Sequence, residues 1–283
     1  PLPTFEYDDE IKQLRDSFDS MQHSLKHYVK ELKETVTSKA SMESELNIAH
    51  HIQMAMLPKT FPAFPHRNDI EIYGMLTPAK SVGGDLYDFM LRDDELFFCI
   101  GDVSGKGVPA SLVMAVSRTL FRNVAVNVDK PHLIVEAMNK SICDGNDSSM
   151  FVTLFVGVLD LATGHLTYCN AGHNPPYLQN KLVASDPNFP VGAIPDWEFI
   201  EEETDIAPGE TLFLYTDGLT EAENANHDEF GEQRVEEIIA SSLAAGDSPK
   251  QMIDNMTAAV TQFVGDTEQS DDLTMLAFRY NKL

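Results

Sequence analysis

Aspartates at the ends of apolar runs are the residues of this sequence best placed to do chemistry. Asp102 follows the run LFFCIG, and Asp217 follows TLFLYT. Asp85 follows a Gly-Gly pair, while Asp271 and Asp272 directly precede LTMLAF. A carboxylate at the end of a buried strand is costly unless it is paired or binds a cation. The adjacent glycines let a ligand approach the backbone closely.

Such carboxylates are suited to binding hard divalent cations. If these strand ends converge, their negative charges lie close together, and bound cations make that arrangement tolerable. Oxygen ligands without a His or Cys cluster select Mg²⁺ or Mn²⁺ over zinc. Each aspartate alone is also typical of a turn or a helix cap. Their recurrence on several apolar runs favours the metal site.

The composition limits the classes of partner. The 283 residues carry 20 Lys+Arg against 45 Asp+Glu, a formal net charge of −25, and 43% are hydrophobic. This is a globular composition, and its acidity argues against binding to nucleic acid or to anionic membrane surfaces. Residues 1–60 have a net charge of −3 and the remaining residues −22. We interpret most of this excess as a solvated surface that favours a basic partner.

Cysteine usage and the chain ends bear on location. Cys99, Cys143 and Cys169 are odd in number and widely spaced, which fits neither a disulfide framework nor a zinc site and indicates a reducing cytoplasm. No apolar run reaches the roughly 18–20 residues that span a bilayer. The sequence begins with Pro1 rather than Met and shows no signal peptide. We therefore expect a piece of a longer protein.

The elements that must position the aspartates follow from the apolar pattern. Long apolar strands with intervening helices predict a layered α/β or α+β domain. The expected strands are 70–76, 95–103, 151–160, 165–172, 211–218 and 273–280. The expected helices are 108–126, 131–143, 231–243 and 249–264.

The first 60 residues follow a different pattern. An apolar stripe with alternating spacings of three and four predicts a helix with a heptad seam; its residues are Ile11, Leu14, Phe18, Met21, Leu25, Tyr28 and Leu32. The stripe breaks over 35–41 and resumes weakly, and prolines at 58, 62 and 65 end the helix. The narrow seam favours pairing with a second copy over packing on the helix's own domain, which remains the alternative.

Seven motifs then occur in an order that resembles a known family. They are SVGGDLYDF (81–89), GDVSGKGVPASLVMA (101–115), MFVTLFVGVLD (150–160), YCNAGHNPPYL (168–178), LYTDGLTEAEN (214–224), FGEQRV (230–235) and SDDLTMLAFRY (270–280). The order resembles the stage II sporulation protein E branch of the type 2C metal-dependent protein phosphatases, which includes sigma-regulator phosphatases. Residues 45–62 resemble the lead-in helix of that branch.

The resemblance implies a fold and a site. The expected fold is an α+β, two-layer antiparallel β-sandwich flanked by helices, with two Mn²⁺ or Mg²⁺ ions between the sheets. Asp102 would bridge both ions, and the backbone carbonyl of Val103 would ligate one. Asp85, Asp217 and Asp271 would supply the other carboxylates, and Asp272 is the less favoured partner of Asp271. Two metal ions can activate water for direct attack on a phosphate ester, so no covalent nucleophile is needed.

Other polar residues receive weaker assignments. Lys80 and Lys106 are candidates for phosphate binding, with a solvated side chain as the alternative for each. His173, in the AGHNPP motif, is interpreted as structural rather than as a proton donor. His50 and His51, on the linker helix, are interpreted as structural or regulatory rather than catalytic. Ser104 and Ser111 have no evident base partner and are interpreted as loop or helix residues.

The segment before the domain carries a second, shorter resemblance. DDEIKQLRDSFDSM (8–21), preceded by PLP, resembles the second half of a HAMP signal-relay module, although Lys12 stands where that module has Gly. This implies a membrane sensor upstream. We therefore divide the chain into a HAMP-like helix (1–36), a helical linker (37–66) and a phosphatase domain (67–283). We expect a cytoplasmic domain of an inner-membrane sensor, dimeric through the N-terminal helix, without membrane contact of its own.

Two classes of function compete with each other. The first is a protein serine/threonine phosphatase that acts on a phosphorylated regulator of the anti-anti-sigma type. The second is a non-catalytic dimeric signalling module that binds a partner protein. A metal-dependent nuclease or cyclase is disfavoured because the sequence has no basic nucleic-acid track and no Gly-rich nucleotide loop.

Overall fold

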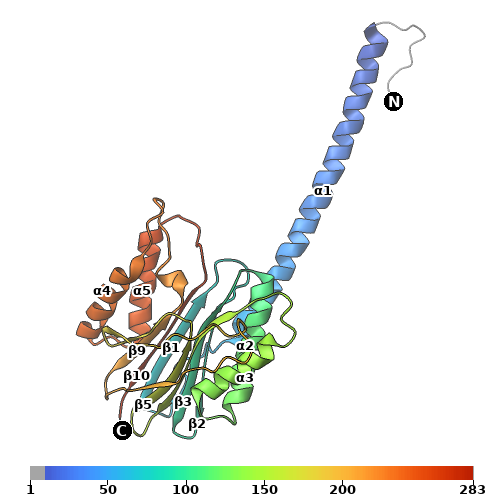
Figure 1. The fold of residues 1–283 in the computed structure, drawn as a ribbon. Helices are drawn as coiled ribbons and strands as arrows, with labels where there is room; N and C mark the ends of the chain where they lie inside the picture. The colour runs from blue at the N-terminus through green and yellow to red at the C-terminus, as the bar shows by residue number, and fades with distance from the viewer. Residues whose placement is uncertain (1–9, 283) are drawn as a thin grey trace. The chain divides into compact units, whose positions relative to one another are not determined.

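The computed structural model describes residues 10–282, which divide between two compact units, Pro1–Ala49 and His50–Leu283. The first helix is α1, Glu10–Met56 (Figure 1). It passes through 35–41 without a break and ends before Pro58, where a proline would remove a helical hydrogen bond. Within residues 10–282, no helix is both long and apolar enough to cross a membrane.

The apolar heptad stripe lies on the first unit. Its seven large side chains, from Ile11 to Leu32, keep between 45% and 72% of their surface exposed. Along this part of α1, Lys30–Glu34 and Lys39–Glu43 are spaced as i,i+4 ion pairs. The stripe therefore lies open in the single chain.

The second unit is a sandwich of two antiparallel sheets. Sheet A has the order β1-β10-β9-β6-β7 and sheet B the order β2-β3-β4-β5-β8. The strands of sheet A are β1 (Ile70–Thr77), β6 (Tyr177–Leu178), β7 (Lys181–Leu182), β9 (Thr211–Tyr215) and β10 (Leu273–Tyr280). Those of sheet B are β2 (Leu86–Arg92), β3 (Glu95–Val103), β4 (Val152–Asp160), β5 (His165–Ala171) and β8 (Glu202–Asp205). The expected α+β sandwich is confirmed.

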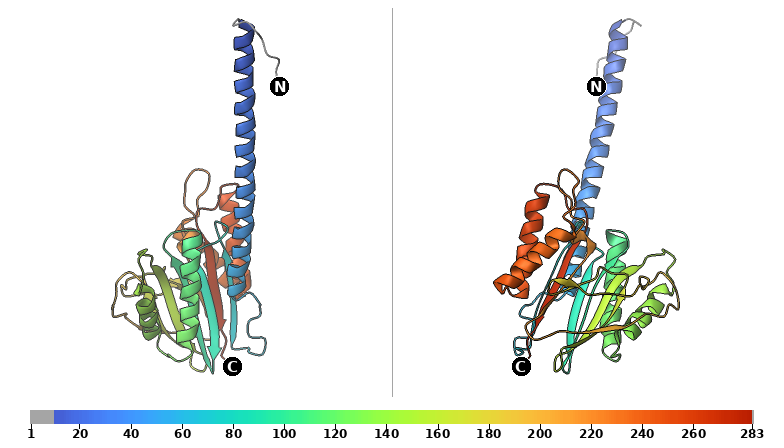
Figure 2. Two further views of the ribbon diagram at one scale, coloured as in Figure 1. Left: turned by 90° about the vertical axis from the view of Figure 1, so that its right-hand side faces the viewer. Right: turned by 60° about the vertical axis from the view of Figure 1, so that its left-hand side comes forward.

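Helices cover both outer faces of the sandwich (Figure 2). They are α2 (Val108–Ala125) and α3 (Pro131–Cys143) against sheet B, and α4 (Gly231–Ala245) and α5 (Pro249–Val264) on the side of sheet A, with a short 3₁₀ turn, η1 (Asp217–Leu219), after β9. These helices match the expected ranges closely. β2, β6, β7 and β8 were not anticipated, since these strands are short or partly polar.

Local signals explain where the helices start and stop. Ser248 caps α5 by accepting from the backbone N–H of Gln251, and the Gln251 side chain accepts from the backbone N–H of Ser248. This is a capping box, with Pro249 at a position where no backbone donor is needed. Gly246 ends α4 in the left-handed conformation, with φ 74°, which glycine adopts without strain.

The core fills both the inter-sheet space and the layers under the helices. Phe98 of β3 stacks on Phe155 of β4 and contacts Phe278 of β10 edge-on, so aromatic side chains join the two sheets. A second cluster, which includes Phe213, Met256 and Val260, packs the outer face of sheet A against α4 and α5. Such burial supplies most of the driving force that holds the strand ends in place.

Candidate metal centre

The predicted carboxylates come from both sheets. Asp102 lies near the end of β3, and Asp85 directly precedes β2, both in sheet B. Asp217 opens η1 after β9, and Asp271 lies just before β10, both in sheet A. Because the strands are antiparallel neighbours, the end of β3 pairs with the start of β2, and the end of β9 with the start of β10.

Asp85 connects the two sheets. Its side chain is 2% exposed, and Oδ2 accepts from Thr216 Oγ1 at 2.7 Å and from Thr274 Oγ1 at 2.5 Å. Burial raises the pKa of Asp85 well above its usual value, the charge of Asp102 raises it further, and the Thr274 hydrogen bond offsets part of the rise. The sequence analysis does not select either threonine; Thr216 directly precedes Asp217, and Thr274 lies two residues after Asp272.

The negative charges of neighbouring carboxylates raise the pKa of Asp102 and of Asp217. Burial, followed by the charge of Asp217, raises the pKa of Asp102 to about 7, and a hydrogen bond with Asp85 opposes this. Burial and then the charge of Asp271 raise the pKa of Asp217. Such mutual effects require short separations in a poorly hydrated region. The structure therefore brings the predicted carboxylates together.

The donor set fits a hard divalent cation in its chemistry and its charge. Negative charges that raise one another's pKa are relieved by a bound cation. The Val103 carbonyl lies against Gly84, where an added Cβ would come within 3.0 Å of its oxygen. Across residues 10–282, however, no three His, Cys, Asp or Glu side chains form a ready-made coordination group. The residues present are chemically suited to such an ion, but they do not already form its coordination shell.

Asp272 has a different role from Asp271. Its Oδ1 accepts from the Ala79 N–H at 2.8 Å, and its Oδ2 accepts from the Gly84 N–H at 2.7 Å. A Cβ on Gly83 would lie 2.0 Å from Asp272 Oδ2, so this close approach requires glycine. These bonds hold the loop that leads to Asp85, and they support the choice of Asp271 as the ligand.

Gln53 of α1 holds the same loop from the other side. Its Nε2 donates to the Gly83 carbonyl at 2.7 Å, and its Oε1 accepts from the Gly83 N–H at 3.1 Å. Gln53 is the one buried residue of α1 in the described part of the chain. Nearby, His50 Nδ1 lies 2.9 Å from the Ser81 carbonyl. Sequence reasoning gave Gln53 no role, because its partner is far away in sequence.

The two candidate lysines differ. Lys106 Nζ lies 2.8 Å from Asp271 Oδ2 and donates to the Ser270 carbonyl at 2.7 Å, so it belongs to the rim of the centre. Lys80 is exposed on the loop before Asp85 and forms no ion pair with any residue that the structure describes. The geometry therefore favours Lys106.

His173 is buried beneath the centre. Its Nδ1 lies 3.1 Å from Thr153 Oγ1, and Thr153 Oγ1 donates to the Asp102 carbonyl at 3.4 Å. The Asn170 side chain bonds both the N–H and the carbonyl of His173. Burial lowers the pKa of His173 to about 4, although the Tyr215 backbone opposes this. His173 is therefore neutral at pH 7 and unsuited to donate a proton.

The two candidate serines hold local structure. Ser104 Oγ accepts from the Phe151 N–H at 2.9 Å, and Ser111 Oγ donates to the Val108 carbonyl at 2.8 Å. Neither contact supplies a general base, so neither side chain has the partner of an activated nucleophile.

Comparison with known proteins places this arrangement in a family. The sequence profile of stage II sporulation protein E (SpoIIE) matches residues 92–281. The chain belongs to the SpoIIE family. Protein IcfG of Synechocystis sp. is 32% identical over 96% of this chain and 46% of its own length. Phosphoserine phosphatase RsbU of Bacillus subtilis is 25% identical over 84% of this chain and 70% of its own length. The chain thus spans about half the length of IcfG.

Solved structures agree on the fold of this SpoIIE-family domain. The SiaA-PP2C domain of Pseudomonas aeruginosa has a TM-score of 0.75 at 21% identity, covering 86% of this chain and 99% of that domain. RsbX in complex with magnesium has a TM-score of 0.57 at 17% identity, covering 76% of this chain and 98% of RsbX. The second unit therefore has the fold of PP2C-type phosphatase domains.

Proposed function

We propose that this chain is a metal-dependent protein serine/threonine phosphatase. The observation that carries the proposal is that carboxylates at the strand ends of both sheets lie near one another. Asp85 joins the two sheets there through its hydrogen bonds from Thr216 and Thr274. Membership of the SpoIIE family supports it, as does the similarity to a phosphoserine phosphatase. The reaction is hydrolysis of a phosphoserine or phosphothreonine ester.

Each residue of the centre has an assigned part. Asp85, Asp102, Asp217 and Asp271, with the Val103 carbonyl, would hold two ions of Mn²⁺ or Mg²⁺, and the Asp102 carboxylate would serve both ions. When bound, the ions supply activation of the attacking water and charge neutralisation at the phosphoryl group. The buried hydrogen bonds of Asp85 keep its carboxylate at a set position, and such preorganisation is needed for this kind of electrostatic catalysis.

Lysine side chains at the rim contribute to phosphate binding. Lys106 stands on a loop between Gly105 and Gly107, both with positive φ. Its side chain is 43% exposed, and its ammonium lies beside Asp271. We assign it to contact the phosphoryl oxygens. Lys80 is the second candidate, on the loop before Asp85. One or two lysines bind phosphate without the bidentate geometry of arginine, so most binding energy must come from the rest of a docked protein substrate.

The biological setting is part of the same proposal. We infer that the substrate is a phosphorylated regulatory protein of the anti-anti-sigma type, as the family resemblance implies. The exposed stripe on α1 supports a homodimer through the N-terminal helix. The HAMP-like helix (1–36), of which residues 1–9 lie outside the described residues, supports a role as the cytoplasmic output domain of an inner-membrane sensor.

The central test removes one carboxylate charge. In the variant Asp102→Asn we expect Mn²⁺-dependent hydrolysis of a phosphoester to fall to the background rate, because the bridging position loses its charge. Circular dichroism should show an unchanged fold, and calorimetric titration should show weakened Mn²⁺ binding. Unchanged turnover in Asp102→Asn would remove the two-metal hypothesis.

A non-catalytic dimeric module that binds a partner protein is the alternative. It predicts that the unaltered chain neither binds divalent ions in calorimetry nor hydrolyses phosphoproteins. The carboxylates argue against it, because Asp85, Asp102 and Asp217 have raised pKa values and come from both sheets, an arrangement found more often at functional sites than elsewhere.

A further inference from the structure

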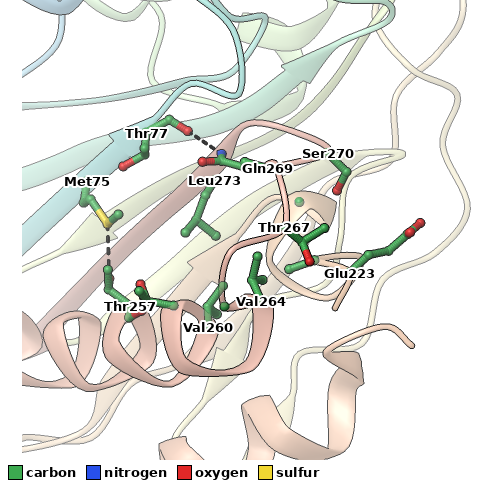
Figure 3. Close-up of a pocket in the computed structure, with 14 residues that line it drawn as sticks. Met75, Thr77, Glu223, Thr257, Val260, Val264, Thr267, Gln269, Ser270 and Leu273 are labelled. Atoms are coloured by element: carbon green, nitrogen blue, oxygen red, sulfur yellow. Dashed lines mark hydrogen bonds between the residues drawn. The ribbon is translucent and has the colours of Figure 1, made fainter. Parts of the chain in front are cut away.

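A cavity of about 220 Å³ opens beside the metal centre, between α5 and sheet A (Figure 3). Its wall consists of side chains of β1, the start of β10, one face of α5 and the loops on either side. The lining residues that matter here are Met75, Gly218, Glu223, Val260, Gln269 and Ser270.

The cavity shares its wall with the metal centre. Gly218 follows Asp217 in sequence, and a Cβ added to Gly218 would lie 1.9 Å from the Asp272 carbonyl oxygen. Gln269 Nε2 donates to the Asp271 carbonyl at 2.6 Å and to the Thr77 carbonyl at 2.9 Å. The cavity lining therefore includes the sequence neighbours of two proposed metal ligands, Asp217 and Asp271.

The cavity is apolar inside and polar at its mouth. Val260, Ala222 and Leu273 are buried in the wall, whereas Thr261 and Ser270 are exposed. Glu223 is the one charged side chain among the lining residues. An enclosed apolar cavity of about 150 Å³ is large enough for benzene, so this one has room for a large apolar side chain.

We propose that this cavity docks an apolar side chain of the protein substrate, close in sequence to the phosphorylated residue and flanked by a basic residue. The proposal rests on the proposed phosphatase function. Gly218 and Ser270 in the cavity lining directly adjoin Asp217 and Asp271 in sequence, so the cavity lies beside the centre that the phosphorylated residue must reach. The charge of Glu223 complements a flanking Lys or Arg. Docking of this kind supplies the binding energy that rim lysines alone lack.

The test uses phosphoserine peptides in which a single Phe-Lys pair is moved through an alanine background. For the unaltered chain with Mn²⁺, we expect at least one placement to raise kcat/KM about tenfold over the peptide without the pair, as expected for partial burial of an aromatic side chain. The variant Thr261→Trp covers the mouth and should abolish this gain. Hydrolysis of p-nitrophenyl phosphate, which is too small to span both sites, should not change.

Thr119→Trp is the matched control. Thr119 and Thr261 are exposed helix residues whose hydroxyls donate to the carbonyl four residues earlier, at 2.7 Å and 2.8 Å. The control should keep the full gain. The docking proposal is overturned if no placement raises kcat/KM, if the gain survives in Thr261→Trp, or if that variant also slows p-nitrophenyl phosphate hydrolysis. If the unaltered chain hydrolyses no phosphoester, the proposed function itself is wrong, and the docking site with it.

Discussion

Asp85 links the two sheets, because its carboxylate precedes β2 of sheet B and accepts hydrogen bonds from Thr216, which follows β9, and Thr274 of β10 in sheet A. It is fully inside the domain, and the hydroxyls of Thr216 and Thr274 are the donors that the structure gives to its Oδ2. A buried charge without hydrogen bonds is very costly. The two threonines therefore contribute both to stability and to the ionised state of Asp85.

Replacing one of these donors tests that role. The variant Thr274→Val keeps the side-chain shape and removes the hydroxyl. We expect the free energy of unfolding to fall by about 1–3 kcal/mol, since the Asp85 carboxylate loses a buried donor. Urea denaturation at pH 7 measures the change. The exposed Thr119→Val is the control and should change stability little, whereas equal stability of the two variants would argue against the role of Thr274.

A second prediction at this scale concerns acid stability. The pKa of His173 is lowered to about 4 in the folded chain, and an unfolded His titrates near about 6.5. The unfolded chain therefore takes up a proton first, so His173 lowers the free energy of unfolding as the pH falls from the unfolded to the folded pKa. The full effect is on the order of 3 kcal/mol.

The variant His173→Gln removes this titration. Denaturation at pH 7 and at pH 5 should show a smaller loss of stability in the variant than in the unaltered chain. The raised pKa values of Asp102 and Asp217 act in the opposite direction in both proteins and cancel in the comparison. If the two proteins lost the same stability, the burial of a neutral His173 would be contradicted.

Among the elements, α1 reaches the metal centre through one residue. Gln53 pairs with both backbone groups of Gly83, two residues before Asp85, while Asp272 holds the neighbouring Gly84. Residues that orient metal ligands typically change metal affinity 10- to 100-fold, by order of magnitude, when they are replaced. The C-terminal turns of α1 therefore belong to the centre, although they carry no ligand.

The variant Gln53→Leu removes both hydrogen bonds at similar volume. We expect the half-saturating Mn²⁺ concentration to rise about tenfold, with kcat at saturating Mn²⁺ much closer to that of the unaltered chain. Calorimetric titration and phosphatase assays measure the two quantities. Gln233→Leu on α4, an exposed glutamine, is the control. A fall in kcat without any change in Mn²⁺ affinity would contradict a positioning role for Gln53.

For the whole molecule, the open heptad stripe predicts association. If two chains pair along α1, the unaltered chain should sediment as a dimer, because the exposed apolar seam is then buried. Leu25→Glu places a charge in the seam and should give monomers. Ser20→Glu places the same charge on the outer face of the helix, away from the seam, and should leave the dimer intact. A monomeric unaltered chain would contradict the homodimer.

Local patterns carried much of the fold and part of the centre. Apolar runs with flanking Gly and Asp predict β3, β9 and β10 together with Asp102, Asp217 and Asp271. This is possible because a buried strand and the turn that ends it are formed by consecutive residues. The helices α2 to α5 were predicted for the same reason. β2 was not, although Asp85 was selected from its glycine neighbours.

Only the tertiary structure decided which groups support these carboxylates. Thr274 lies 189 residues from Asp85 in sequence, and Gln53 lies 30 residues from Gly83. The periodicity of the sequence does not predict such a pairing. The pairing forms only when the two sheets pack and bring their strand ends together. The sequence by itself determined which residues carry charge at strand ends. The packing of sheet A on sheet B decided that Asp85, Asp102 and Asp217 lie where water is largely excluded, and this desolvation is the main physical reason for the raised pKa of each.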